Sequence, residues 1–430
     1  MSKSHETQRW VTLVFCLLAS LCAGFGYSWS VLLKPMGEMF DWSASAVSLS
    51  FTLLIVFAAS TSIFTGKALQ YAQPRTLLLL GAVVFGAGIA CLGFVDSLGM
   101  LYGLSMVSGV GLGIIYPGAT MTNLVRYFPD KRGLASGLLA AGYGIGPVVW
   151  APITVALINN LGLMWAFRIM GMLFFVLVAF CSRLVTTAPY GYAPAGYTPE
   201  VARKSKTQVV EDKDWKDMLK SPVFYVLFIL FTIGTTSGLM VIGHASPIAQ
   251  DVLGISAEAA GTVVSYLAIG MVVGKIGWGA LSDRVGRYPV FVAMLVMAAI
   301  ALVVLWRGDT YLPVVLGICA VGVCYGGFLA LMSPIVAETF GNKNLGINFG
   351  IMFLTVALAA YVGPRLAASV LEATGGDYAW AFIIAAIISA AGLVLVVGYM
   401  LARRKTPAKP EVETSARRMD PVEKVETSKA

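Results

Sequence analysis

The sequence predicts an all-α membrane protein with twelve transmembrane helices in two similar six-helix bundles. Hydrophobic residues other than glycine make up 58% of the 430 residues, and charged residues only 12%. A soluble chain of this length needs far more polar surface, so most of this surface is expected to face lipid. Apolar runs also follow one another along almost the whole chain, and about 20 such residues in a helix cross a bilayer.

The first apolar run follows a polar segment, residues 1–9. It is longer than the core of a signal peptide and has no small-residue cleavage site after it, so it is expected to remain as the first helix. In chain order the predicted spans are 10–33, 45–66, 76–95, 99–124, 133–157, 163–182, 222–247, 257–281, 288–306, 312–337, 345–369 and 379–402.

Basic residues indicate the orientation of the helices. Only Lys34, Arg168 and Arg307 fall in the loops of one face, and Lys275 and Arg365 fall within spans. All other Lys and Arg residues lie on the opposite face, which the positive-inside rule assigns to the cytoplasm. The sequence therefore predicts a multi-pass protein of the cell membrane, the bacterial inner membrane, with both termini cytoplasmic.

The longest connection divides the chain. Residues 183–221 are rich in Pro, Gly and Tyr and then in mixed charges, as is typical of a linker. We expect a cytoplasmic segment at 1–9, bundles at 10–182 and 222–402, and a disordered cytoplasmic tail at 403–430.

Short strings recur in the two halves at a nearly constant spacing. Gly66-Lys67-Ala68-Leu69 matches Gly279-Ala280-Leu281-Ser282, and Trp165-Ala166-Phe167 matches Trp380-Ala381-Phe382. Because each half holds an even number of helices, the repeat is expected to be parallel, with its axis along the membrane normal.

Composition also argues against several functions. The net charge of +8 is spread over short loops, which fits membrane orientation better than a nucleic-acid surface. The six cysteines lie in apolar runs without metal-binding spacing, so we expect neither metal nor disulfide. No catalytic triad, phosphate loop or kinase signature occurs, and we predict no enzyme and no catalytic residue; a membrane enzyme or sensor would need a folded domain after Arg404.

A motif lies between the eighth and ninth predicted helices. Gly279-Ala280-Leu281-Ser282-Asp283-Arg284-Val285-Gly286-Arg287 resembles the G-x-L-[SA]-D-R-x-G-R loop of the major facilitator superfamily. Asp283 can accept hydrogen bonds from a helix N-terminus, while Arg284 and Arg287 pair with carboxylates. Contacts of this kind favour one of two rigid-body arrangements, so these three residues are gating candidates. A simple anchoring turn is the alternative. The equivalent first-half loop has Gln70 at the aspartate position.

A more specific resemblance covers most of the chain between Arg9 and Leu401. Its strings are Tyr27-Ser28-Trp29, the segment 111–116, Arg126-Tyr127-Phe128-Pro129-Asp130-Lys131-Arg132-Gly133, and Ala140-Ala141-Gly142-Tyr143-Gly144. They resemble the oxalate:formate antiporter branch of the monocarboxylate porters. The resemblance implies an organic-anion substrate, no covalent catalysis and no bound cofactor. The resemblance also makes Asp130 and Arg132 candidates for gating.

The same resemblance implies a substrate-binding cation on the eighth helix, at Lys275. The position lies about 12 Å from Asp283 along the helix, near the bilayer centre, where an unpaired ammonium costs a few kcal/mol. An anionic substrate would offset that cost. The alternatives are a lysine that snorkels to the interface or pairs with a carboxylate, but no Asp or Glu lies deep in any span. Relatives usually have Arg there, and lysine lacks its bidentate geometry.

The family's cavity is lined by aromatic residues, which match Tyr27, Tyr116, Tyr143 and Tyr325 here. A tyrosine can donate to a carboxylate while its ring packs on the aliphatic part of an acid, although helix packing explains each tyrosine equally well. His244 matches a polar cavity position. It could contact substrate or carry a proton, or it could bond a backbone carbonyl as a structural residue.

The oxalate carriers have a second substrate-binding cation on the eleventh predicted helix, and the matching position here is Val356. Arg365 on the same helix is a candidate to substitute for that cation; the alternative is a charge that packs near the outer end of the helix. One central cation favours one carboxylate. We therefore predict a secondary transporter of a monocarboxylate, with proton symport or anion exchange, acting as a monomer in the bilayer without nucleic acid. A carrier of a dicarboxylate such as oxalate, or of another small solute, is the alternative.

Overall fold

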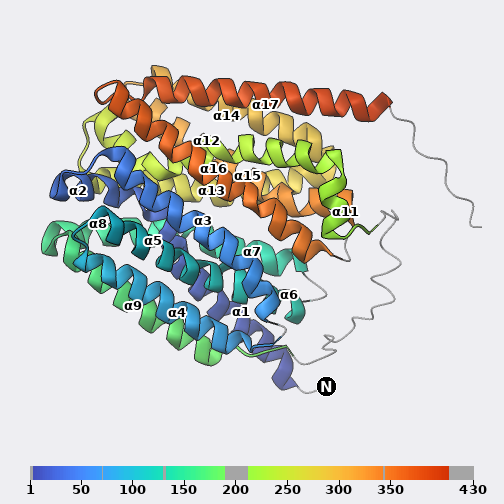
Figure 1. The fold of residues 1–430 in the computed structure, drawn as a ribbon. Helices are drawn as coiled ribbons and strands as arrows, with labels where there is room; N and C mark the ends of the chain where they lie inside the picture. Colours follow the sequence, from blue (N-terminus) through green and yellow to red (C-terminus); the bar gives the residue numbers. More distant parts are fainter. Residues whose placement is uncertain (1–2, 70, 129–131, 189–211, 342–343, 406–430) are drawn as a thin grey trace, which may run out of the picture.

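The computed structural model describes residues 3–69, 71–128, 132–188, 212–341 and 344–405 (Figure 1). Within these ranges, twelve helical spans are long and apolar enough to cross a membrane. This confirms the predicted all-α membrane fold. Asp130 and the gating prediction on it lie outside the described residues, as do most of the predicted linker and tail.

Six spans come from the first half of the chain. Their elements are α1 (Lys3–Ala23), η1 (Gly24–Ser28), α2 (Ser30–Phe40), α3 (Ala44–Ala68), α4 (Pro74–Cys91), η2 (Leu92–Phe94), α5 (Leu98–Gly113), η3 (Ile114–Ala119), α6 (Thr120–Tyr127), α7 (Arg132–Gly144), α8 (Gly146–Leu161) and α9 (Leu163–Leu184).

The second half is more regular. A short helix, α11 (Trp215–Lys220), precedes α12 (Pro222–Leu253), α13 (Ala257–Val285), α14 (Arg287–Arg307), α15 (Tyr311–Phe340), α16 (Leu345–Ala373) and α17 (Ala379–Lys405). Each of these six long helices corresponds to one predicted span. Several extend a turn or more beyond it, because hydropathy marks only the apolar part of a helix.

The two halves pack against each other along their length. In Figure 1 the first half, blue to green, lies below the second half, yellow-green to red. Contact between the halves is made mainly by α3 against α16, by α7 and α8 against α13, and by α2 against α12. We call the end that holds the start of α1, α11 and the end of α17 the linker side. The opposite end, where α2 and α8 end, is the far side.

Three of the predicted helices are interrupted where candidate residues lie: the first, the fourth and the fifth, which is divided into α7 and α8 just after Tyr143. The first span changes to a 3-10 turn at Gly24–Ser28, which carries Tyr27. A Cβ on Gly24 would lie 2.3 Å from the carbonyl oxygen of Tyr143, so only glycine permits this close approach of the first span to α7. The fourth span breaks at Tyr116, whose backbone is extended (φ −136°, ψ 132°). Pro117 follows Tyr116, and a proline ring disfavours helical backbone angles at the residue before it.

Candidate functional site

Four tyrosines from four separate spans meet at the contact between the halves. The hydroxyls of Tyr27 and Tyr325 share a hydrogen bond of 2.8 Å, which joins η1 of the first half to α15 of the second. The ring of Tyr143 lies edge-on to Tyr27 at 4.9 Å between centroids, and Tyr116 stacks on Tyr143 at 4.3 Å. We call Tyr27, Tyr116, Tyr143 and Tyr325 the tyrosine cluster. The structure therefore brings together all four tyrosines that the sequence singled out.

Lys275 lies beside this cluster. Its ammonium donates a hydrogen bond of 2.9 Å to the carbonyl oxygen of Ala140, one turn before Tyr143 on α7. A Cβ on Gly144 would lie 3.5 Å from the same nitrogen. The Lys275 side chain of the second half therefore reaches across to the turn of the first half that carries Tyr143.

Glycines on α13 and α15 set the position of Lys275 relative to Tyr325. A Cβ on Gly274 would lie 1.9 Å from the carbonyl oxygen of Val323, and one on Gly326 would lie 2.0 Å from that of Met271. The two helices therefore touch backbone to backbone, the close packing that small residues allow between membrane helices. This contact holds Lys275 next to the turn of α15 that carries Tyr325.

The charge of Lys275 is not balanced by an acidic side chain in the described part of the chain, where no ion pair involves it. An ammonium has three donors, and its one described hydrogen bond goes to a neutral carbonyl. A positive charge deep in a membrane-spanning helix can bind a carboxylate through charge-assisted hydrogen bonds.

His244 is placed differently from the other substrate-binding candidates. It is buried, its Nε2 lies 3.0 Å from the carbonyl oxygen of Pro364 and 3.2 Å from the hydroxyl of Ser48, and its Nδ1 lies 3.1 Å from the Tyr378 hydroxyl. Because a carbonyl only accepts, Nε2 carries the proton and Nδ1 accepts from Tyr378. This carbonyl contact matches the structural alternative, and none of these partners belongs to the tyrosine cluster.

The structure also describes the surroundings of the two candidate positions on α16, Arg365 and Val356. Arg365 donates a hydrogen bond of 3.1 Å to the hydroxyl of Tyr361, four residues earlier on α16, and Tyr361 is 49% exposed. Its described contacts do not include the tyrosine cluster. Val356, at the second-cation position of the oxalate carriers, is 2% exposed. Lys275 is therefore the cation that the described contacts bring to the tyrosines.

Two of the gating candidates, Asp283 and Arg287, form ion pairs within the second half. Arg287 donates to Asp283 at 2.5 Å and to Glu338 at 2.9 Å, so it joins the linker-side ends of α13, α14 and α15. Arg284 is exposed. Glu338 was not singled out from the sequence, because a charge at a helix end is usually solvated. Arg132 begins α7, and its side chain is not described.

Polar contacts close the far side, and no sequence pattern pointed to them. Lys34 forms an ion pair with Asp251, and the amide of Asn159 donates to Glu258. The backbone amide of Ser45, at the start of α3, donates a hydrogen bond of 2.7 Å to Glu372. Each contact joins the first half to the second, and in each a carboxylate comes from the second half.

Metal binding has no structural support: within the described ranges, no group of three or more His, Cys, Asp or Glu residues could hold a metal ion. The site consists of one cation, phenol hydroxyls and backbone groups. Such groups can bind and release a small anion.

Comparisons with known proteins identify the family of the chain. The family profile of the Major Facilitator Superfamily matches residues 16–248 and 235–427. The chain is 32% identical over 425 residues to the oxalate:formate antiporter of Oxalobacter formigenes, covering 95% of each chain. It is 26% identical over 356 residues to the uncharacterized MFS-type transporter YhjX of Escherichia coli (strain K12), covering 82% of this chain and 85% of that one.

Solved structures show the same fold. The crystal structure of a mutant of the nucleoside transporter NupG aligns with a TM-score of 0.71 at 12% identity, covering 91% of this chain and 99% of that chain. A bacterial homolog of the human lysosomal transporter Spinster, in an inward-facing and occupied conformation, aligns with a TM-score of 0.69 at 16% identity, covering 95% and 100%. The chain belongs to the major facilitator superfamily, and it is a multi-pass membrane transporter rather than an enzyme.

Proposed function

We propose that this transporter carries a small organic anion, a monocarboxylate such as lactate, pyruvate, formate or glyoxylate, by alternating access. The observation that carries the proposal is the position of Lys275, a membrane-embedded ammonium beside four tyrosines with a backbone carbonyl as its described partner. A substrate carboxylate would supply the missing negative charge. The tyrosine hydroxyls would complete its hydrogen bonds.

One carboxylate fits this arrangement better than two. The described contacts bring a single cation to the cluster, while Val356 is apolar and Arg365 contacts Tyr361. A dicarboxylate such as oxalate is the second candidate. It is supported by the 32% identity to a protein named for oxalate and formate.

Alternating access requires that contacts on the two sides form in turn. The far-side contacts Lys34–Asp251 and Ser45–Glu372 would have to break for substrate to enter or leave there. We propose that the far side is the outside of the cell and the linker side the cytoplasm, because the basic residues concentrate on the linker side. A cysteine at Lys34 should then react with an impermeant reagent added to intact cells.

The coupling mode has two alternatives, proton symport and anion exchange. The name of the Oxalobacter formigenes relative supports exchange. The test is uptake of a panel of labelled acids by proteoliposomes, with or without unlabelled acid inside and with or without a pH gradient. We expect saturable uptake of a monocarboxylate that internal acid stimulates. Uptake of uncharged or cationic solutes with no acid transported would refute the proposed substrate class.

A further inference from the structure

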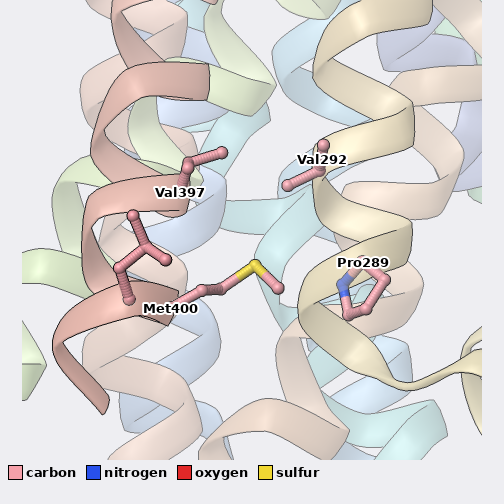
Figure 2. A pocket seen from close by; sticks show the side chains of 5 residues that line it. Pro289, Val292, Val397 and Met400 are labelled. Atoms are coloured by element: carbon pink, nitrogen blue, oxygen red, sulfur yellow. The ribbon is translucent and has the colours of Figure 1, made fainter. Parts of the chain in front are cut away.

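A groove opens on the outer flank of the second half, between α14 and α17 near the linker side (Figure 2). Its volume is about 350 Å³, and it is lined by Pro289, Val292, Val397, Met400 and Leu401. All five side chains are apolar. Val397 is 39% exposed and Leu401 is 53% exposed, so this surface faces the surroundings of the bundle.

The groove lies where α14 begins and near the end of α17. On α14, Pro289 is the third residue, so the groove begins within the first helical turn. Because α14 and α17 are membrane-spanning, the apolar lining meets lipid and not water.

Basic residues adjoin the groove residues in the sequence. Arg284 is exposed just before α14, and Arg287 is the first residue of α14. On α17, Arg403, Arg404 and Lys405 follow the lining residues directly.

The described acidic groups nearby leave this positive charge in excess. Asp283 and Glu338 lie at the same end of the bundle, and both pair with Arg287. Arg284 and the three basic residues that end α17 add four further positive charges at this end. An apolar channel that ends at basic residues is complementary to a lipid with an apolar chain and an anionic headgroup.

We propose that this groove binds an anionic phospholipid, with an acyl chain along Val292, Val397 and Met400 and a phosphate headgroup at the basic ends of α14 and α17. The partner is a membrane component, so the proposal is independent of the transported substrate. Each basic residue that faces an anionic headgroup should strengthen binding about fivefold.

The test is native mass spectrometry of the full chain, titrated with phosphatidylglycerol or with phosphatidylcholine of the same acyl chains. Wild type should bind phosphatidylglycerol at least about fivefold more tightly. Val397→Trp fills the groove and should abolish this tight binding. Val394→Trp is the matched control, because Val394 lies one turn away on α17, is 74% exposed and does not line the groove.

A second pair of variants shows whether a loss of lipid binding comes from the filled groove or from misfolding of one variant. Val292→Trp fills the groove from α14, and Val296→Trp, one turn further along, is its control. Arg403→Gln with Arg404→Gln should reduce the preference for phosphatidylglycerol and leave phosphatidylcholine binding unchanged. Equal lipid binding by groove and control variants would overturn the groove assignment. Equal binding of the two lipids by wild type would overturn the anionic headgroup.

Discussion

Lys275→Gln removes the charge of the proposed substrate cation and keeps an N–H donor. In the structure the Lys275 ammonium donates to Ala140 at 2.9 Å, and a glutamine amide can keep a donor near that carbonyl. Folding should therefore survive, since loss of a buried charge that has no acidic partner does not by itself destabilise a protein. What is lost is the charge-assisted contact to the substrate carboxylate. Such a contact contributes about 1.5–3 kcal/mol, which corresponds to about tenfold to a hundredfold in Kd.

The assay is equilibrium binding of the transported acid to purified protein, together with uptake into proteoliposomes. Arg365→Gln is the matched control, because it removes the other cation within a predicted span while its described partner is Tyr361. Lys275→Arg should retain part of the activity, because the charge remains while the geometry changes. Wild-type affinity in a folded Lys275→Gln protein would refute the role of Lys275. An equal loss in Arg365→Gln would show that Arg365 is a second substrate cation.

Four further variants test other parts of the account. Gly144→Leu should weaken acid binding at least about tenfold by displacing Lys275, whereas Gly144→Ala should bind nearly as wild type, because a Cβ there would lie 3.5 Å from the ammonium; equal affinities would separate Gly144 from the site. Ser48→Ala removes a far-side contact of His244 and should favour the far-side-open state about fivefold, as spin-label distances would show; unchanged distances would refute the contact's role in closure. Arg287→Gln should slow turnover with nearly unchanged Kd, because its described partners are Asp283, Glu338 and Ser282; a matching loss of binding would mean that the loop shapes the site. Val356→Lys should increase inhibition of uptake by oxalate, since a second cation finds its partner in a second carboxylate, and unchanged inhibition would argue against selection by cation number.

The sequence predicted the number and order of the membrane helices well, because each helix must bury its backbone in lipid and needs a long apolar run to do so. It did not predict the breaks at Gly24 and Tyr116. These breaks follow from close backbone approach and from a proline neighbour, and an average of hydropathy over many residues is insensitive to both.

The composition of the site came from family resemblance, while its geometry came from the fold. The strings around Tyr27 and Tyr143 identified the tyrosines, and the structure shows that their rings touch. The bond from Lys275 to Ala140 could not be foreseen, since a backbone carbonyl is present at every residue. The role of His244 could not be predicted from the sequence, because residue type alone does not distinguish a histidine that contacts substrate from a buried one that bonds to the carbonyl of Pro364.

The far-side ion pair illustrates a further limit. Lys34 and Asp251 are 217 residues apart in the sequence, and each alone is an ordinary loop charge. Only the packing of one half on the other brings them together. Contacts between the halves are also those that must change during transport, so the least predictable contacts are the most informative about mechanism.

The most direct measurement compares the binding of a transported monocarboxylate with that of its uncharged amide, using wild-type protein and the same assay conditions. The two ligands have nearly the same size and differ in the negative charge that Lys275 is proposed to bind. We predict saturable binding of the acid and at least about tenfold weaker binding of the amide. Equal affinity for both would contradict the proposal that this transporter recognises an organic anion.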